Sequence, residues 1–245
     1  TQSPEHQKLL KDYGLFDTRP ILARAEKCTS CHLAIDAKLI EAGHPQPIFE
    51  LAYYTGLENP HWREPGGYWD TKVWAAGQII CLRDAMTQVA DRASSGASDK
   101  LIKDAYDQAM GHLEICRSMA PSALDGPAKD FKAAAGDKAK LATLAKSIST
   151  LAGTLTAPVA AMKPAAENTA GILSKIAGDG NIATDAGLRG AQQQALSLAS
   201  LAGSLKKGGN PAGIDDVQKM IDEKLLALVG DETTFKAPEF NKNVQ

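Results

Sequence analysis

The residues with the clearest chemistry are Cys28, Cys31 and His32, which spell Cys-x-x-Cys-His. Two thiols at this spacing can each add across a vinyl group of a haem, giving the two thioether bonds of a c-type haem. The adjoining histidine can then bind the iron as an axial ligand. The motif therefore predicts one covalently attached haem c, with Cys28 and Cys31 as attachment points and His32 as the proximal ligand.

The same cysteine spacing occurs in zinc sites and in redox-active dithiols, so these alternatives were weighed. A zinc site needs a second Cys or His pair at similar spacing, but the other cysteines, Cys81 and Cys116, are single and far apart in the sequence. A thioredoxin-like motif needs a strand followed by a helix, whereas the flanking residues here predict helix and loop. We therefore expect haem attachment.

The sixth ligand of the iron has several candidates. His44 is preferred, because Pro45 and Pro47 stiffen its loop and a stiff loop loses less entropy when it holds a ligand. His61 and His112 are the alternative distal ligands. The methionines at helical spacing are expected in the core instead; they are Met86, Met110 and Met119. A vacant or water-bound sixth position also stays open.

Cys81 and Cys116 form the second pair of cysteines. Both fall in predicted helices, and a haem of this type is attached in an oxidising compartment, so a disulfide between them is one expectation. Such a bond would stabilise the fold by ~3–4 kcal/mol in the chain-entropy model. The alternative is a pair of buried free thiols, because the sequence does not fix the distance between them.

Hydrophobic periodicity predicts a mainly α protein without a convincing strand. Every Trp and Tyr lies before residue 120, whereas the second half is rich in Ala, Leu, Gly and Ser. We therefore predict a haem-binding domain over 1–125, made of short helices and long loops, and an antiparallel helical bundle over 126–245. The predicted helices span 4–13, 21–31, 33–42, 48–55, 71–93, 99–119, 128–155, 157–177, 184–206 and 214–229, and residues 231–245 are predicted to form an extended tail.

Composition limits the classes of partner. The chain has 245 residues, 44% of them hydrophobic, and a net charge of −2. Neither half is basic enough to suggest nucleic-acid binding, and no apolar run approaches the ~18 residues of a membrane span. Because haem c is attached outside the cytoplasm, we expect a periplasmic or otherwise extracytoplasmic protein whose signal peptide has been removed.

Several further segments resemble the diheme and multihaem cytochrome c-554-like family. They include Ala42-Gly43-His44-Pro45 with Phe49-Glu50-Leu51, and Pro60-His61-Trp62. In that family a Tyr-Asp pair opens a second haem motif. The corresponding stretch here is Tyr106-Asp107-Gln108-Ala109-Met110-Gly111-His112, which keeps the histidine and lacks both cysteines. The resemblance, which covers roughly 20–120, implies a two-haem cytochrome that has retained one haem, with His44 as an iron ligand.

The expected function is transfer of single electrons between redox protein partners. Two histidine ligands leave the iron no open position for a substrate, so we expect no enzymatic activity. The helical second half is expected to dock a partner, another copy of the chain or a larger redox complex. Two alternatives remain: a five-coordinate haem that binds a small gas or peroxide, and a haem-bearing structural subunit.

Overall fold

The fold is taken from a computed structural model, which describes residues 3–14, 16–33, 35–57 and 63–245. Those residues form helices joined by loops and contain no strand, so the predicted mainly α fold is confirmed. The helices are α1 (Pro4–Asp12), α2 (Ile21–His32), α3 (Ala37–Glu41), α4 (Leu51–Leu57), α5 (Trp69–Ser94), α6 (Asp99–Arg117), α7 (Pro121–Ala133), α8 (Lys138–Ala161), α9 (Ala166–Gly178), α10 (Asn181–Gly208), α11 (Ile214–Met220), the π-helical turn η1 (Ile221–Leu225), α12 (Leu226–Leu228) and α13 (Ala237–Val244).

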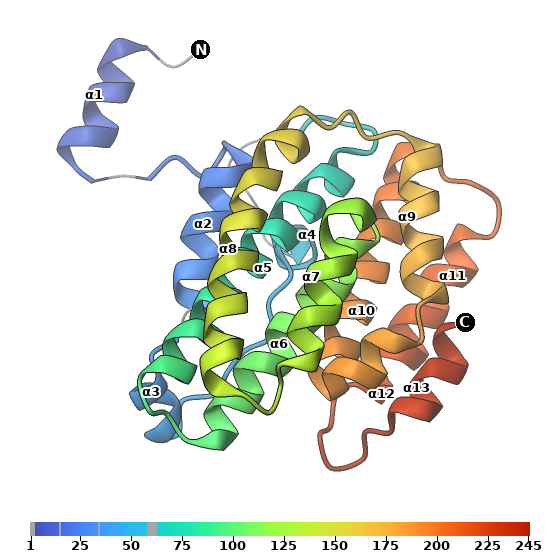
Figure 1. Cartoon of the computed structure of the whole chain (residues 1–245). Coiled ribbons are helices and arrows are strands. Elements are labelled where there is room, and N and C mark those ends of the chain that lie inside the picture. Colours follow the sequence, from blue (N-terminus) through green and yellow to red (C-terminus); the bar gives the residue numbers. More distant parts are fainter. Residues whose placement is uncertain (1–2, 15, 34, 58–62) are drawn as a thin grey trace.

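Helix α5 forms the centre of the molecule. Its side chains are buried on nearly every side, and Trp74, Ile80 and Met86 are each 0% exposed. Most residues of α5 are buried, although Thr87 and Asp91 are exposed, and α2, α4, α6, α8 and α10 pack around the helix (Figure 1). The helix that carries the cysteine motif, α2, therefore packs on the central helix of the fold.

One hydrophobic core joins the two halves of the chain. Phe49 and Leu82 from the first half and Phe131 and Leu201 from the second belong to the same buried cluster. The domain boundary predicted between residues 125 and 126 falls inside α7. The structure thus shows no division into two cores at that point, because the Ala- and Leu-rich helices pack directly onto α5 and α6.

The helix predicted over 128–155 is in fact parts of two helices. Helix α7 ends at Ala133 and α8 begins at Lys138, where the Asp137 carboxylate accepts from the Lys140 backbone N–H at 3.0 Å. This N-cap satisfies a backbone donor that the start of a helix leaves unpaired. The break predicted between the helices over 128–155 and 157–177 is also wrong, because α8 continues to Ala161.

The end of the chain is helical where an extended tail was predicted. In α13, Phe240 is 0% and Val244 is 4% exposed, and the helix packs on α10. The Asn241 amide donates to the carbonyl of Gly180 at 2.8 Å. Two apolar residues four positions apart are enough to bury one helical face, although they are too few to give a period in the sequence.

At the other end of the chain, α1 stands away from the helical body (Figure 1). Within the described ranges, none of the helices is both long enough and apolar enough to span a membrane.

Candidate functional site

Helix α2 carries the cysteine motif on its last turn and is fixed to α5 by its opposite side. The Thr29 side chain is fully buried, and its hydroxyl donates to Asp84 of α5 at 2.6 Å. With this side held, Cys31 and His32 are exposed and Cys28 is half-buried. The three side chains of the motif are therefore accessible at the end of an anchored helix.

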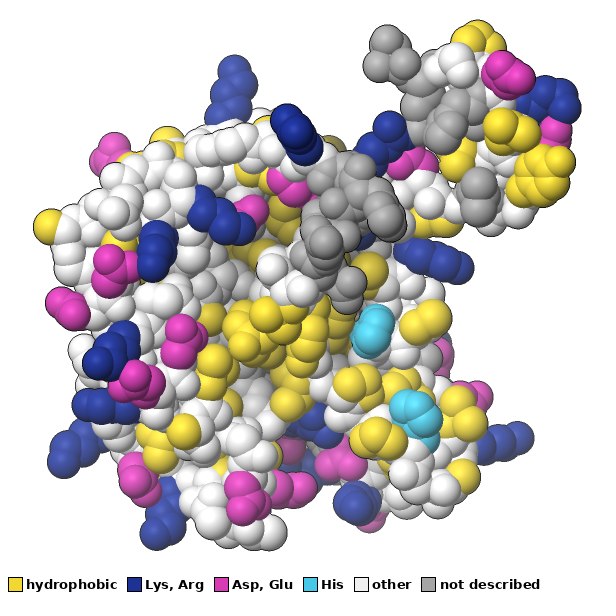
Figure 2. All heavy atoms as spheres, turned by 180° about the vertical axis from the view of Figure 1, so that it is seen from behind, with side chains coloured by type: hydrophobic (Ala, Val, Ile, Leu, Met, Phe, Trp, Pro, Cys, Tyr) yellow, Lys and Arg dark blue, Asp and Glu magenta, His cyan; other side chains and the backbone are white. Residues whose placement is uncertain are grey.

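Flat apolar side chains lie next to the motif. The His32 imidazole stacks on the Phe49 ring, with 5.1 Å between the centroids and 14° between the planes, and Phe49 stacks on Tyr54 at 5.9 Å. Tyr54 is 40% exposed and Leu57, on the same helix, is 70% exposed. Figure 2 shows hydrophobic side chains gathered near the centre of one face of the molecule, with histidine side chains beside them. Such a surface suits a large flat ligand.

His44 is exposed on the loop after α3, and its imidazole is held in one tautomer. Gly43, with φ 96°, turns the chain at the end of α3. The Nδ1 atom of His44 lies 2.7 Å from the Pro45 carbonyl oxygen. Because that oxygen only accepts, Nδ1 is the donor in this contact, and in the neutral ring Nε2 is the nitrogen with the lone pair. Histidines that bind metals commonly make this second hydrogen bond.

Buried side chains of α5 hold the segment between the two candidate axial histidines. The Gln88 amide donates to the carbonyls of Leu33, at 3.1 Å, and Ile35, at 3.3 Å. The Arg92 guanidinium donates to the Ile35 carbonyl at 3.4 Å and to the Gln46 amide oxygen at 3.2 Å. Leu33 and Ile35, which follow His32, and Gln46, which follows His44, are therefore held by the same helix that anchors α2.

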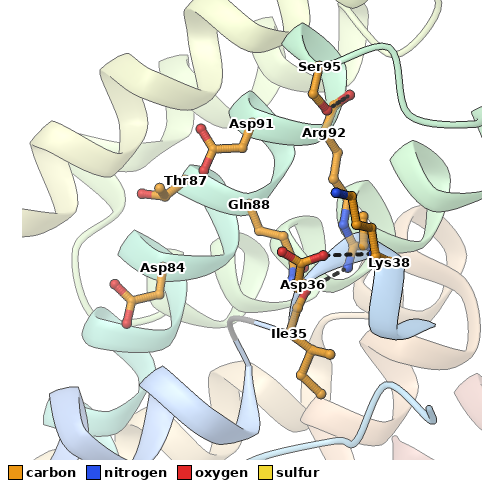
Figure 3. A pocket seen from close by; sticks show the side chains of 10 residues that line it. Ile35, Asp36, Lys38, Asp84, Thr87, Gln88, Asp91, Arg92 and Ser95 are labelled. Atoms are coloured by element: carbon orange, nitrogen blue, oxygen red, sulfur yellow. Dashed lines mark hydrogen bonds between the residues drawn. The ribbon is translucent and has the colours of Figure 1, made fainter. Parts of the chain in front are cut away.

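A cavity of about 510 Å³ lies between this segment and α5 (Figure 3). Its walls carry the carboxylates of Asp36, Asp84 and Asp91, together with Lys38 and Arg92. In the part of the chain that the structure describes, no group of three or more His, Cys, Asp or Glu is arranged to hold a metal ion. The acids in this cavity therefore do not form a metal site, and the cavity adjoins the motif without including it.

The other predicted iron ligands lie elsewhere. His112 is fully buried, with its Nδ1 atom 2.9 Å from the Gln78 amide oxygen, and its Nε2 atom is buried without a hydrogen-bond partner among the described residues. Burial lowers the pKa of His112 to about 3, so the ring is neutral. Met86 and Met110 are 0% exposed in the core and Met119 packs against it. His61 lies outside the described residues.

Cys81 and Cys116 are free thiols in the structure, so the predicted disulfide is absent from it. Both are 0% exposed, on α5 and α6. Burial raises the pKa of each thiol, and for Cys81 the nearby Glu50, Asp84, Cys116 and Cys28 raise it further. The arrangement is that of the alternative, two inert buried thiols.

A buried polar cluster behind Phe49 was not foreseen from the sequence. The Glu50 carboxylate accepts from the Ser200 hydroxyl, and the Phe49 carbonyl accepts from the Gln193 amide at 3.1 Å. These contacts link the motif's aromatic neighbour to α10. The available signal was the spacing of polar residues along α10 at intervals of three and four, which places them on one buried helical face: Gln193, Ser197, Ser200 and Ser204.

Comparison with known proteins adds no relative, since the chain matches no family model, no curated protein and no solved structure.

Proposed function

We propose that this chain carries single electrons on one haem c, attached through Cys28 and Cys31 and bound at the iron by His32 and His44. One observation carries the proposal: the motif stands at the accessible end of an anchored helix, against the apolar rings of Phe49 and Tyr54. A zinc site would instead need further ligands beside the cysteines.

Different residues of the chain would have different roles at the proposed haem site. When bound, the haem supplies a reversible one-electron couple at its iron. Phe49 and Tyr54 would cover its apolar surface and exclude water. The His44 Nε2 lone pair is available because Nδ1 donates to the Pro45 carbonyl. With His32 and His44 both holding the iron, no position would stay open for a substrate, which would favour electron transfer over catalysis.

The packing of α6 favours one haem over two. Gly111 and Gln108 stand where the cytochrome family that the sequence resembles has the cysteines of a second haem motif. A Cβ atom at position 111 would lie 3.1 Å from the Cα atom of Gly190, so α10 occupies the space that a cysteine side chain there would need. His112, which would have been the ligand of that second haem, is enclosed between helices.

The proposal extends to location and partners. Attachment of haem c outside the cytoplasm supports a periplasmic or otherwise extracytoplasmic site of action, with redox proteins as electron donor and acceptor. The exposed Tyr54 stacks on Phe49, the ring that contacts His32, and would therefore lie near the point of contact.

Expression in a host that attaches haem c tests the proposal. We expect a pigmented protein whose mass exceeds that of the polypeptide by one haem, and whose low-spin spectrum carbon monoxide does not change. A colourless protein of plain polypeptide mass would end the proposal. A pigmented protein that binds carbon monoxide would instead support the gas- or peroxide-binding alternative.

The distal ligand is tested by His44→Ala. We expect the variant to lose the low-spin spectrum and to bind carbon monoxide, because one axial position opens. Gln46→Ala is the matched control, since Gln46 lies on the same loop and contacts Arg92. The control should stay low-spin; if both variants change alike, loss of loop structure explains the effect and His44 is not the ligand.

A further inference from the structure

Glu50 is a completely buried carboxyl group beside the proposed haem site. It is 0% exposed and accepts hydrogen bonds from the backbone N–H groups of Ala52, at 3.0 Å, and Tyr53, at 2.6 Å. The Ser200 hydroxyl donates to the same carboxylate. In the described ranges, no Lys or Arg forms an ion pair with Glu50. The group is therefore fixed in place by hydrogen bonds and left without a compensating charge.

The position of Glu50 connects the iron ligand to α10. Glu50 directly follows Phe49, whose ring stacks on His32. The Gln193 amide donates to the Phe49 carbonyl and the Ser200 hydroxyl donates to the Glu50 carboxylate, and both donors belong to α10. The carboxyl group thus lies one residue from the ring that contacts the proposed axial ligand.

The ionisable neighbours of Glu50 do not stabilise its charge. On α5 they are Asp70, which is paired with Lys207 at 2.6 Å, and Cys81; on α4 the neighbour is Tyr54. The α10 residue in contact with it, Ser200, is uncharged. The pKa of Glu50 is raised to about 7, and burial is the largest cause. The charge of Asp70 also raises this pKa, whereas the hydrogen bonds from Ser200, Ala52 and Tyr53 lower it.

We propose that Glu50 takes up a proton when the iron held by His32 gains an electron, and releases it when the iron is oxidised. The inference rests on the proposed function. One electron would pass from the donor redox protein to the haem that Cys28, Cys31 and His32 would hold, and one proton would pass from water to the Glu50 carboxylate, giving the acid. The net charge of the buried region is then unchanged, which avoids the electrostatic cost of an added negative charge at low dielectric.

The inference is tested by the midpoint potential of the haem-loaded protein between pH 5 and 9. We expect the wild-type midpoint potential to fall as pH rises through the neutral range. If one proton is bound per electron, the equilibrium constant for reduction of the haem should decrease by at most about tenfold for each pH unit. In Glu50→Gln this part of the dependence should vanish. Glu114→Gln is the matched control, because Glu114 is also a buried acid, 3% exposed, but is paired with Arg117 on α6.

Infrared difference spectra of the oxidised and reduced protein give a second readout. We expect a band of a protonated carboxyl group on reduction of wild type and its loss in Glu50→Gln. If that variant does not fold, Ser200→Ala keeps the carboxyl group and removes a hydrogen bond that lowers its pKa. The pH dependence should then move to higher pH.

The two proposals fail in different ways. A protein without attached haem would overturn the proposed function. A haem-loaded wild type with the same pH dependence as Glu50→Gln, or Ser200→Ala with an unmoved pH dependence, would overturn the role of Glu50 and leave the function intact.

Discussion

Glu50 and His112 are both fully buried, and burial shifts their pKa values in opposite directions. Burial disfavours the charged form of each group, so the pKa of the acid rises and the pKa of the imidazole falls. Glu50 binds a proton more tightly in the folded than in the unfolded chain, and its stabilising contribution is lost as pH rises. His112 contributes above its unfolded pKa of 6.5 and loses that contribution as pH falls toward about 3.

The contribution of Glu50 to protein stability should therefore decrease as pH rises. The pKa of Glu50 is about 7 in the folded protein and its ordinary value is 4.5. The contribution of Glu50 to the free energy of unfolding is therefore complete below pH 4.5 and disappears as pH rises past 7. Between pH 5 and 8 we expect the free energy of unfolding of wild type to fall by about 2–3 kcal/mol relative to Glu50→Gln. Urea unfolding of the protein without haem measures this; parallel curves for the two proteins would contradict it.

Helices α6 and α10 approach closely at two glycines. A Cβ atom on Gly111 would lie 3.1 Å from the Gly190 Cα atom, which is backbone and cannot rotate away. The same contact gives a physical reason for a glycine at position 111.

Gly111→Ala tests this helix crossing. We expect the substitution to destabilise the protein by about 1–3 kcal/mol, because the helices must separate to admit the methyl group. Gly153→Ala on α8 is the control, since nothing lies within 4 Å of its Cβ position, and it should stabilise by about 1 kcal/mol through helix propensity. Thermal unfolding distinguishes the two; equal effects would argue against a close α6–α10 contact.

At the scale of the whole molecule, residues beyond 125 complete the core around α5. Helix α8 covers α5 along its length, and the Ser149 hydroxyl of α8 donates to the Arg83 carbonyl of α5 at 3.0 Å. Without α8 and α10, the apolar surfaces of α5 and α6 would be exposed to water. The segment beyond residue 125 is therefore part of the structure that holds α2.

A chain ending at residue 125 should accordingly fail to fold cooperatively. We expect weak helical circular dichroism and no sigmoidal urea transition, because burial of α5 is the main source of stability. The full chain measured under identical conditions is the reference. A cooperative transition in the shortened chain would support the two-domain division predicted from composition.

Local features of the sequence were sufficient for the mainly α fold class, for most helices and for the Cys28, Cys31 and His32 motif. Helical periodicity and the spacing of three reactive side chains within one turn are short-range properties, so they can be read without knowing what packs against them. The stiff loop around His44 is local in the same sense.

Only the tertiary structure decided which residues surround that motif. Phe49 lies against His32, and Glu50 meets Ser200 from the far part of the chain. The continuous core across residue 125 and the buried α13 also depend on long-range packing. The physical reason is that burial and hydrogen-bond partnership are settled between segments distant in sequence, where no local pattern specifies the partner.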